Sequence, residues 1–257
     1  MRTQNFVHLN VHSHYSINDG CASIRELVDA AIKDKMLGMA ITDNGNMFGV
    51  MELFDYVSRI NNERRQKGKK PFKPIIGCEL YVAPCAKEDK KLGKHCKGYR
   101  LTVLAKNYQG YKNLIKIVSN SWTDGFYMRP RTDHHDLEKY HEGIIVLSGG
   151  VGSEVYSHVV SDDIAGLDAT IKWYKQTFGM DYYLELQRCA DYDLKSDTPS
   201  DLMLEQQRVN AVLMQKAKES GVKVVATNDV HYVAPEDLAA YNIQQCYATG
   251  KTMDEFA

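Results

Sequence analysis

Two short stretches, near opposite ends of the chain, carry the residue types that bind metal ions. Residues 6–19 read FVHLNVHSHYSIND, and polar and apolar side chains alternate in the first half. This is the pattern of a strand that presents its polar side chains, histidines among them, on one face. Residues 227–232 read TNDVHY and place Asp229 and His231 on the same side of an extended segment. Mixed imidazole and carboxylate ligands suit zinc, manganese or iron better than calcium.

The candidate ligands of these types are His12, Asp19, Glu79, Asp229 and His231. A cluster of metal ions held by such residues could activate water and clamp a phosphate ester. The residues alone also permit a structural role, because half-buried histidines are common and an Asp-x-His segment after a strand can serve only to form hydrogen bonds. Both interpretations remain open on this ground.

The elements that position these residues alternate along the chain. Strands are predicted at residues 6–12, 37–42, 75–82, 100–105, 144–147, 182–186 and 222–226. Helices are predicted to begin at a capping box at residues 23–26 and near residue 48, and to span 108–122, 163–178, 202–220 and 235–247. Regular alternation predicts an α/β protein with a parallel sheet and favours a closed barrel, with an open doubly wound sheet as the alternative.

Several polar residues are expected at the same end of the predicted sheet. The residues at or just beyond the carboxyl ends of predicted strands include His12, Asp43, Asn44, Gly149, Asp229 and His231. β/α barrels place their chemistry at this face. We expect Asp43, within TDNGN, to be a loop residue that fixes backbone N–H groups, with orientation of a ligand as the alternative.

Composition limits the class of protein. The chain has 257 residues, 44% of them hydrophobic, and a net charge of -1, which predicts one domain and argues against a dedicated nucleic-acid module, although not against nucleic acid as a partner. Its six cysteines include no CxxC pair, and neither a signal peptide nor a run of about 20 apolar residues is present. We therefore expect a soluble cytoplasmic protein with reduced thiols and no membrane partner.

Three charged segments have open roles. Residues 64–70 (RRQKGKK) are most simply a solvated helix end, with DNA contact as the alternative. Residues 87–97 are expected to form a mobile surface loop. Tyr127, Arg129 and Arg131 could contact DNA or another region of the protein, and internal packing is the alternative.

Nine ordered stretches carry a resemblance to a known family. They read FVHLNVHSHYSINDG, AITDNGNMFG, PIIGCELYVAP, YRLTVLAKNYQGYKNLIKIVS, GFYMRPRTD, GIIVLSGG, WYKQTFG, YYLELQ and VVATNDVHY. They resemble the polymerase and histidinol phosphatase (PHP) domain of bacterial DNA polymerase III alpha subunits. The resemblance implies a distorted seven-stranded β/α barrel and, in complete members, a multi-metal cluster that hydrolyses phosphoesters, including 3′–5′ exonuclease activity. It also implies that residues 1–257 are the amino-terminal PHP domain of a longer replicative polymerase.

Carried over by position, the resemblance implies a degenerate metal site. His12, Asp19, Glu79, Asp229 and His231 stand at ligand positions of the family, whereas Asn10, Asn44, Arg100 and Gly150 stand where the family has three histidines and a cysteine. An Asn amide is a weak ligand, glycine offers none, and a guanidinium has only donors. We expect that no full cluster assembles, while residual zinc or manganese remains an alternative. His8 and His14 are possible replacement ligands, with a structural or exposed role as the alternative.

Arg100 has a specific expected role. Without metal cations, clustered carboxylates repel one another or take up protons. We predict that Arg100 replaces a metal ion by pairing with Glu79 or Asp229; a surface arginine at a strand start is the alternative.

Three functions follow from the resemblance. The first is a non-hydrolytic structural or docking module, whose partners are the remaining polymerase domains of the same chain, a proofreading exonuclease subunit, other replicase subunits and, through the parent protein, DNA. The parent would be a DNA-directed DNA polymerase, a nucleotidyltransferase that uses magnesium and residues outside this segment. The second is a metal-dependent 3′–5′ exonuclease with a reduced cluster. The third is a small-molecule phosphatase, against which the polymerase-like stretch GFYMRPRTD argues.

Overall fold

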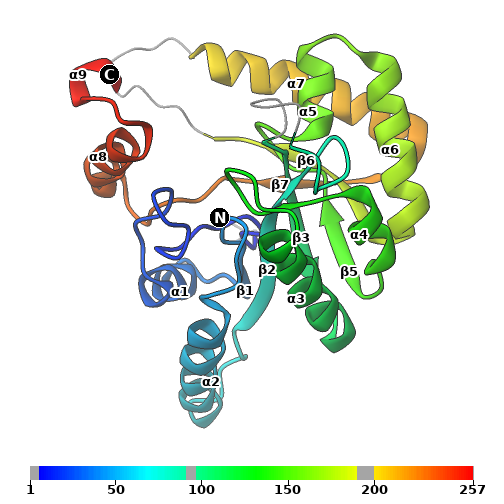
Figure 1. Ribbon diagram of the computed structural model, residues 1–257. Helices are drawn as coiled ribbons and strands as arrows, with labels where there is room; N and C mark the ends of the chain where they lie inside the picture. Colours follow the sequence, from blue (N-terminus) through cyan, green and yellow to red (C-terminus); the bar gives the residue numbers. More distant parts are fainter. Residues whose placement is uncertain (1–5, 91–96, 190–199, 257) are drawn as a thin grey trace. The chain divides into compact units, whose positions relative to one another are not determined.

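The computed structural model describes residues 6–90, 97–189 and 200–256, so Cys96 and the predicted loop beyond residue 90 lie largely outside the described residues. The chain divides into two compact units (Figure 1). The terminal unit comprises Met1–Cys78 with Val230–Ala257, and the central unit comprises Glu79–Asp229. Strand β2 (Lys73–Val82) contributes to both, and each unit is described by itself.

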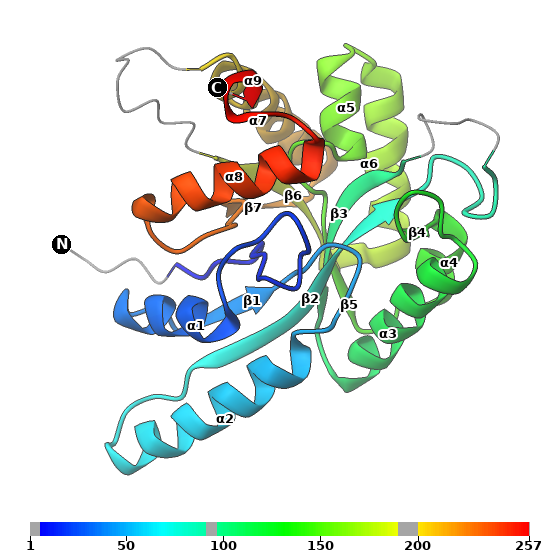
Figure 2. The ribbon, with the colours of Figure 1, turned by 60° about the vertical axis from the view of Figure 1, so that its left-hand side comes forward.

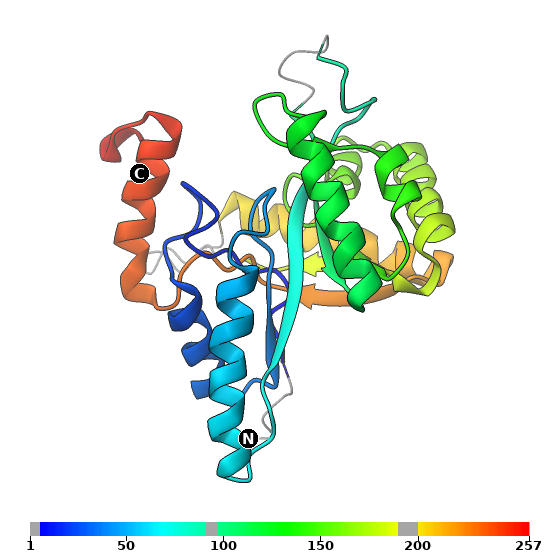
Figure 3. The same cartoon turned by 60° about the horizontal axis from the view of Figure 1, so that its bottom comes forward.

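The terminal unit contains one parallel strand pair and several helices. Its β1 (Gly38–Ile41) pairs with the first residues of β2. Its helices are α1 (Ile24–Lys33), α2 (Val50–Gln66), η3 (Pro235–Asp237), α8 (Leu238–Thr249) and α9 (Met253–Phe256). The predicted capping box at the start of α1 is confirmed: Ser23 and Glu26 each accept a hydrogen bond from the backbone N–H of the other. Figure 3 shows α2 and the start of β2 running side by side.

The prediction of a regular strand at residues 6–12 is wrong. Among the described residues, this segment makes one isolated parallel bridge, between Val11 and Val230. The N–H of Val11 donates to the hydroxyl of Thr42 rather than to a strand carbonyl, at 2.8 Å. At Val11 a polar side chain thus takes the place of a strand carbonyl, and the chain bends at residues 9 and 10, while the N–H of His12 donates to the carbonyl of Val230 at 2.8 Å.

The central unit contains the remainder of the sheet. Its strands are the end of β2, β3 (Tyr99–Ala105), β4 (Arg131–Thr132), β5 (Ile144–Leu147), β6 (Tyr182–Gln187) and β7 (Lys223–Thr227). The order runs β2-β3-β5-β6-β7, with β4 beside β2. β3 and β5 are antiparallel, so the prediction of an all-parallel sheet is wrong. Two helices and β4 intervene between β3 and β5, and the chain does not make the single-helix crossover that the parallel rule assumes.

Five α-helices among the described residues belong to the central unit. They are α3 (Tyr108–Thr123), α4 (His134–Lys139), α5 (Glu154–Val160), α6 (Ile164–Phe178) and α7 (Asp201–Ser220), with the 3₁₀ turn η2 (Gly179–Asp181) before β6. Figures 1 and 2 show α5 and α6 side by side. They bury apolar residues such as Val155, Leu167 and Ile171, and this burial is what holds such amphipathic helices in place.

Arg131 packs inside the central unit. It is fully buried, and its guanidinium donates hydrogen bonds to the carbonyls of Gly125, at 3.1 Å, and of Lys87 and Asp89. The packing alternative is therefore the correct one for this residue. Lys87 is 6% exposed, and its ammonium lies 3.1 Å from the carboxylate of Asp136. The expectation of a mobile loop is thus wrong for its first residues, because buried hydrogen bonds fix them.

Two global expectations can be compared with the described residues. None of the described cysteines forms a disulfide. No described helix combines the length and apolar character needed to cross a membrane.

Candidate functional site

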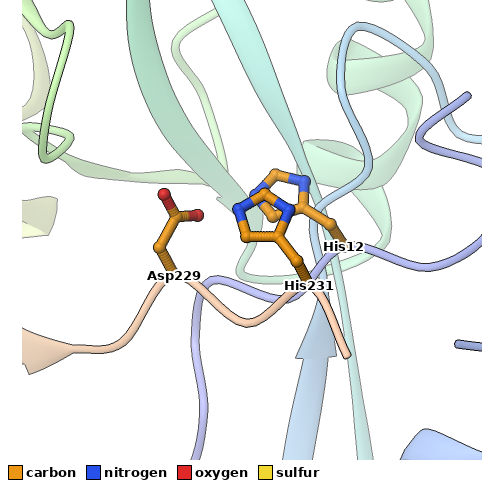
Figure 4. Close-up of side chains that lie close together, drawn as sticks. All are labelled: His12, Asp229 and His231. Atoms are coloured by element: carbon orange, nitrogen blue, oxygen red, sulfur yellow. The ribbon is translucent and has the colours of Figure 1, made fainter. Parts of the chain in front are cut away.

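The predicted ligands of the terminal unit gather around two stacked imidazoles, and we call this group the histidine cluster: His12, Asp19, Asp43, Asn44 and His231. The rings of His12 and His231 lie 4.5 Å apart, with planes 8° from parallel (Figure 4). Nδ1 of His12 lies 3.3 Å from the hydroxyl of Ser16, and Nδ1 of His231 contacts the carbonyl of Asp19. If this contact carries the proton on Nδ1 of His231, its Nε2 keeps a lone pair, as in metal-bound histidines.

Asp43 holds the loop that follows His12 by hydrogen bonds to Ser13 and Ser16. Its carboxylate accepts hydrogen bonds from the N–H of Ser13, at 2.7 Å, and from the hydroxyls of Ser13 and Ser16. The prediction that Asp43 fixes backbone N–H groups is confirmed. Because Ser16 also contacts His12, Asp43 orients an imidazole through one intervening hydroxyl.

The two asparagines make hydrogen bonds of their own. Asn10 is fully buried, and its carbonyl oxygen accepts from the hydroxyl of Thr42 at 2.9 Å. Asn44 donates from its amide to a carboxylate oxygen of Asp19 at 2.6 Å. The amide N–H of Asn44 is thus hydrogen-bonded to a carboxylate oxygen of Asp19 that a metal ion would need as a ligand.

His8 and His14 fit the structural or exposed alternative. His14 is exposed, while His8 is partly buried and packs edge-on against the ring of Phe6, with ring centroids 5.0 Å apart. Burial lowers the pKa of His8, because desolvation disfavours the imidazolium.

The predicted ligands of the central unit surround Arg100. Its Nε lies 3.4 Å from Oε1 of Glu79, and its Nη1 lies 3.8 Å from Oδ2 of Asp229. The side chain of Glu79 is 3% exposed and that of Arg100 is 26% exposed. The predicted pairing of Arg100 with Glu79 or Asp229 is confirmed, and the guanidinium in fact reaches both carboxylates.

Glu185 is a third carboxylate of this group, and the sequence reasoning missed it. It is buried and accepts hydrogen bonds from the N–H of Gly149 and the hydroxyl of Thr227. Burial raises the pKa of Glu185 to about 7, and the charges of Glu79 and Asp229 act in the same direction. The available signal was a lone acidic residue within a predicted strand, residues 182–186 (YYLEL). We call Glu79, Glu185 and Asp229 the carboxylate cluster.

The side chain of Gln187 fills the space beside Gly150. A Cβ added to Gly150 would lie 2.1 Å from both Cδ and Oε1 of Gln187. That amide oxygen accepts a hydrogen bond from the N–H of Val151 at 3.0 Å, so Gln187 is held in this position. The sequence reasoning missed Gln187 as well, although it ends the same strand as Glu185.

The two groups differ in how well they fit metal ions. In the histidine cluster, two imidazoles and the Asp19 carboxylate are the ligand types of a zinc or manganese ion. In the carboxylate cluster, a guanidinium already stands within 4 Å of two carboxylates, and a second cation there would meet like-charge repulsion. This repulsion opposes the binding of several metal ions at the carboxylate cluster.

The comparison with protein families defines the class. The model of the PHP domain matches residues 8–189, and the chain belongs to the PHP domain family. The predicted α/β fold class and the recognition of this family are confirmed.

The curated relatives include DNA polymerase III alpha subunits of several bacteria. DNA polymerase III subunit alpha of Borreliella burgdorferi is 41% identical over 254 residues, which cover 97% of this chain and 20% of that protein. The subunit of the same name from Treponema pallidum is 35% identical, with 99% and 20% covered. The chain thus spans about a fifth of the length of these relatives. Among solved structures, histidinol phosphate phosphatase from Lactococcus lactis matches with 10% identity and a TM-score of 0.42, over 96% of this chain and 95% of that one.

Proposed function

We propose that the chain is the PHP domain of a bacterial DNA polymerase III alpha subunit, and that it acts there as a structural and docking module without hydrolysing phosphoesters. The observation that carries the loss of hydrolysis is the pairing of Arg100 with Glu79 and Asp229. The names of the relatives and their sequence identity to this chain support the proposal that the parent protein is a DNA polymerase III alpha subunit.

The electrostatics favour this proposal. At an effective dielectric constant near 20, a unit charge pair about 4 Å apart gains roughly 4 kcal/mol before desolvation is subtracted. Arg100 supplies that charge without any metal ion, and the amide of Asn44 supplies a donor to Asp19. Gly150 offers no ligand atom, and the amide of Gln187 stands beside it. Arg100, Asn44 and Gly150, which stand at ligand positions of the family, therefore all disfavour a metal cluster.

The role of the whole protein follows from this assignment. The remainder of the parent chain would extend a primer with magnesium as a DNA-directed DNA polymerase in the cytoplasm. The domain would hold the other polymerase domains, a proofreading exonuclease subunit and other replicase subunits in place. The parent protein would bind the primed DNA that it extends.

One observation favours a second candidate, a metal-dependent 3′–5′ exonuclease with a reduced cluster. His12 is buried, and its ring stacks on His231, whose Nδ1 contacts a backbone carbonyl. Such an imidazole can offer Nε2 to one zinc or manganese ion. This candidate requires activity that a chelator removes.

Elemental analysis of the protein purified without chelator, paired with a nuclease assay on 3′-ended DNA, tests the proposal. We expect no stoichiometric zinc or manganese and no hydrolysis. Metal bound at one ion per chain, together with chelator-sensitive hydrolysis that His12→Ala abolishes, would establish the exonuclease instead. The exposed His14 provides the matched control, because His14→Ala should change neither measurement.

A further inference from the structure

A strongly basic surface lies where α2 ends and the chain reverses into β2 (Figure 2). Residues 64–73 read RRQKGKKPFK and contain no acidic residue, in a chain whose net charge is -1. We call this segment the basic turn, and its cations are Arg64, Arg65, Lys67, Lys69, Lys70 and Lys73. All except Arg64, which is partly buried, are exposed. Within the described residues, none of the six forms an ion pair with a carboxylate.

The backbone of the basic turn is fixed. The side-chain amide of Asn61 donates to the carbonyl of Phe72 at 2.8 Å and accepts from its N–H at 2.7 Å. The ring of Phe72 is 1% exposed, and Nε of Arg64 donates to the carbonyl of Lys70 at 2.8 Å. The turn therefore presents its lysines from a backbone that needs no ordering when a partner binds.

Helix stability does not account for this concentration of charge. Cations in the last turn of a helix interact favourably with its dipole, which explains Arg64 and Arg65. Lys69, Lys70 and Lys73 lie beyond the helix, where the dipole effect has decayed. These cations repel one another, which brings no benefit to the fold. An anion bound between them would attract each cation and so offset this repulsion.

We infer that the basic turn binds the phosphate backbone of nucleic acid, independently of base sequence. Lysine ammonium groups on long, exposed stems neutralise phosphates as point charges. The one aromatic residue of the turn, Phe72, is buried, so no ring is available to stack on bases or to enter a lipid surface. This contact uses no residue of the two candidate ligand clusters, and it goes beyond the proposed function.

The test is the salt dependence of binding by the 257-residue chain, measured by fluorescence anisotropy with a labelled duplex and a labelled single strand between 50 and 200 mM salt. Each phosphate contact contributes about −0.9 to the slope of log K against log salt for a duplex and about −0.7 for a single strand. We expect Lys69→Gln with Lys70→Gln and Lys73→Gln to reduce the duplex slope by about 2 to 3 and the affinity at 50 mM salt at least about tenfold. The slopes are measured separately for the duplex and for the single strand, and their comparison shows how the chain binds each form of nucleic acid.

A matched triple variant controls for net charge. Lys116, Lys172 and Lys218 are exposed lysines on three helices of the central unit, and their replacement by glutamine removes the same three charges. This control should retain the wild-type slope, and circular dichroism with thermal melting checks that both variants fold. Equal weakening in the control, or an unchanged slope in the basic-turn variant, would overturn the inference. Binding to phosphatidylserine vesicles without binding to either DNA would overturn it too, and would indicate a membrane surface.

Discussion

Arg100 supplies a positive charge beside the buried carboxylate of Glu79 and beside Asp229, and its removal should take this favourable interaction away. We predict that Arg100→Met lowers the free energy of unfolding by on the order of 2–4 kcal/mol at pH 8, as for other broken pairs with a buried member. Chemical denaturation measures this loss. Arg129, whose guanidinium packs over the ring of Tyr81 at 4.7 Å, provides the control: Arg129→Met should cost about 1 kcal/mol or less. Equal costs would show that Arg100 contributes through packing and not through charge.

Glu185 should make stability depend on pH. Its pKa is raised from the ordinary value of 4.5 to about 7, so between these values the folded protein holds a proton that the unfolded chain releases. Stability attributable to this group is present below about pH 4.5 and is lost as the pH rises through 7, by on the order of 3 kcal/mol.

Glu185→Gln tests this dependence, because an amide of the same shape cannot ionise. Denaturation midpoints at several pH values should decline from pH 5 to pH 8 in the wild type and decline less in the variant. Glu138→Gln, at an exposed position of α4, should follow the wild type. If the denaturation midpoint of Glu185→Gln declines with pH as much as that of the wild type, Glu185 does not cause the pH dependence.

At the scale of elements, the loop after β5 and the end of β6 are matched to each other at Gly150 and Gln187. We predict that Gly150→Ala destabilises the protein by about 1–3 kcal/mol, since its Cβ would lie 2.1 Å from the amide of Gln187. Gly150 has no positive φ, so the cost is steric.

A double-mutant cycle with Gln187→Ala isolates this contact. In the shortened background, Gly150→Ala should cost less than about 0.5 kcal/mol, measured by chemical denaturation. The same cost in both backgrounds would mean that Gln187 does not occupy the space in solution.

Elements with strong local signals could be predicted from the sequence. The capping box predicted the start of α1, and the helices predicted at residues 108–122, 163–178 and 202–220 are present as α3, α6 and α7. The short elements β4, α4 and α5 were missed, because two to seven residues give too little periodicity. Residues 6–12 had the pattern of a strand, but the hydroxyl of Thr42 accepts a hydrogen bond from the N–H of Val11, and sequence alone cannot show this contact.

The candidate site could be predicted only in part, for a similar reason. Residue types and the family resemblance identified the ligand positions, and simple electrostatics predicted the pairing of Arg100. Glu185 and Gln187 became visible only in the structure, because their importance arises from neighbours distant in sequence, such as Gly149 and Gly150. Burial, which raises the pKa of Glu185, is likewise a property of the folded unit.

At the scale of the whole molecule, the terminal unit is discontinuous in sequence, whereas the central unit is one continuous segment. The bridge between Val11 and Val230 and the hydrogen bond from Gln244 to the carbonyl of Gly20 join the two parts of the terminal unit. A ribosome that adds about 5–20 residues per second needs on the order of 10 s to pass from the first part to the second. During this interval the central unit can fold as it emerges, while residues up to Cys78 wait for the bridge at Val230 and for helix α8, which complete their unit. The histidine cluster, with His12 in the early part and His231 in the late part, is therefore among the last features of the domain to form during synthesis.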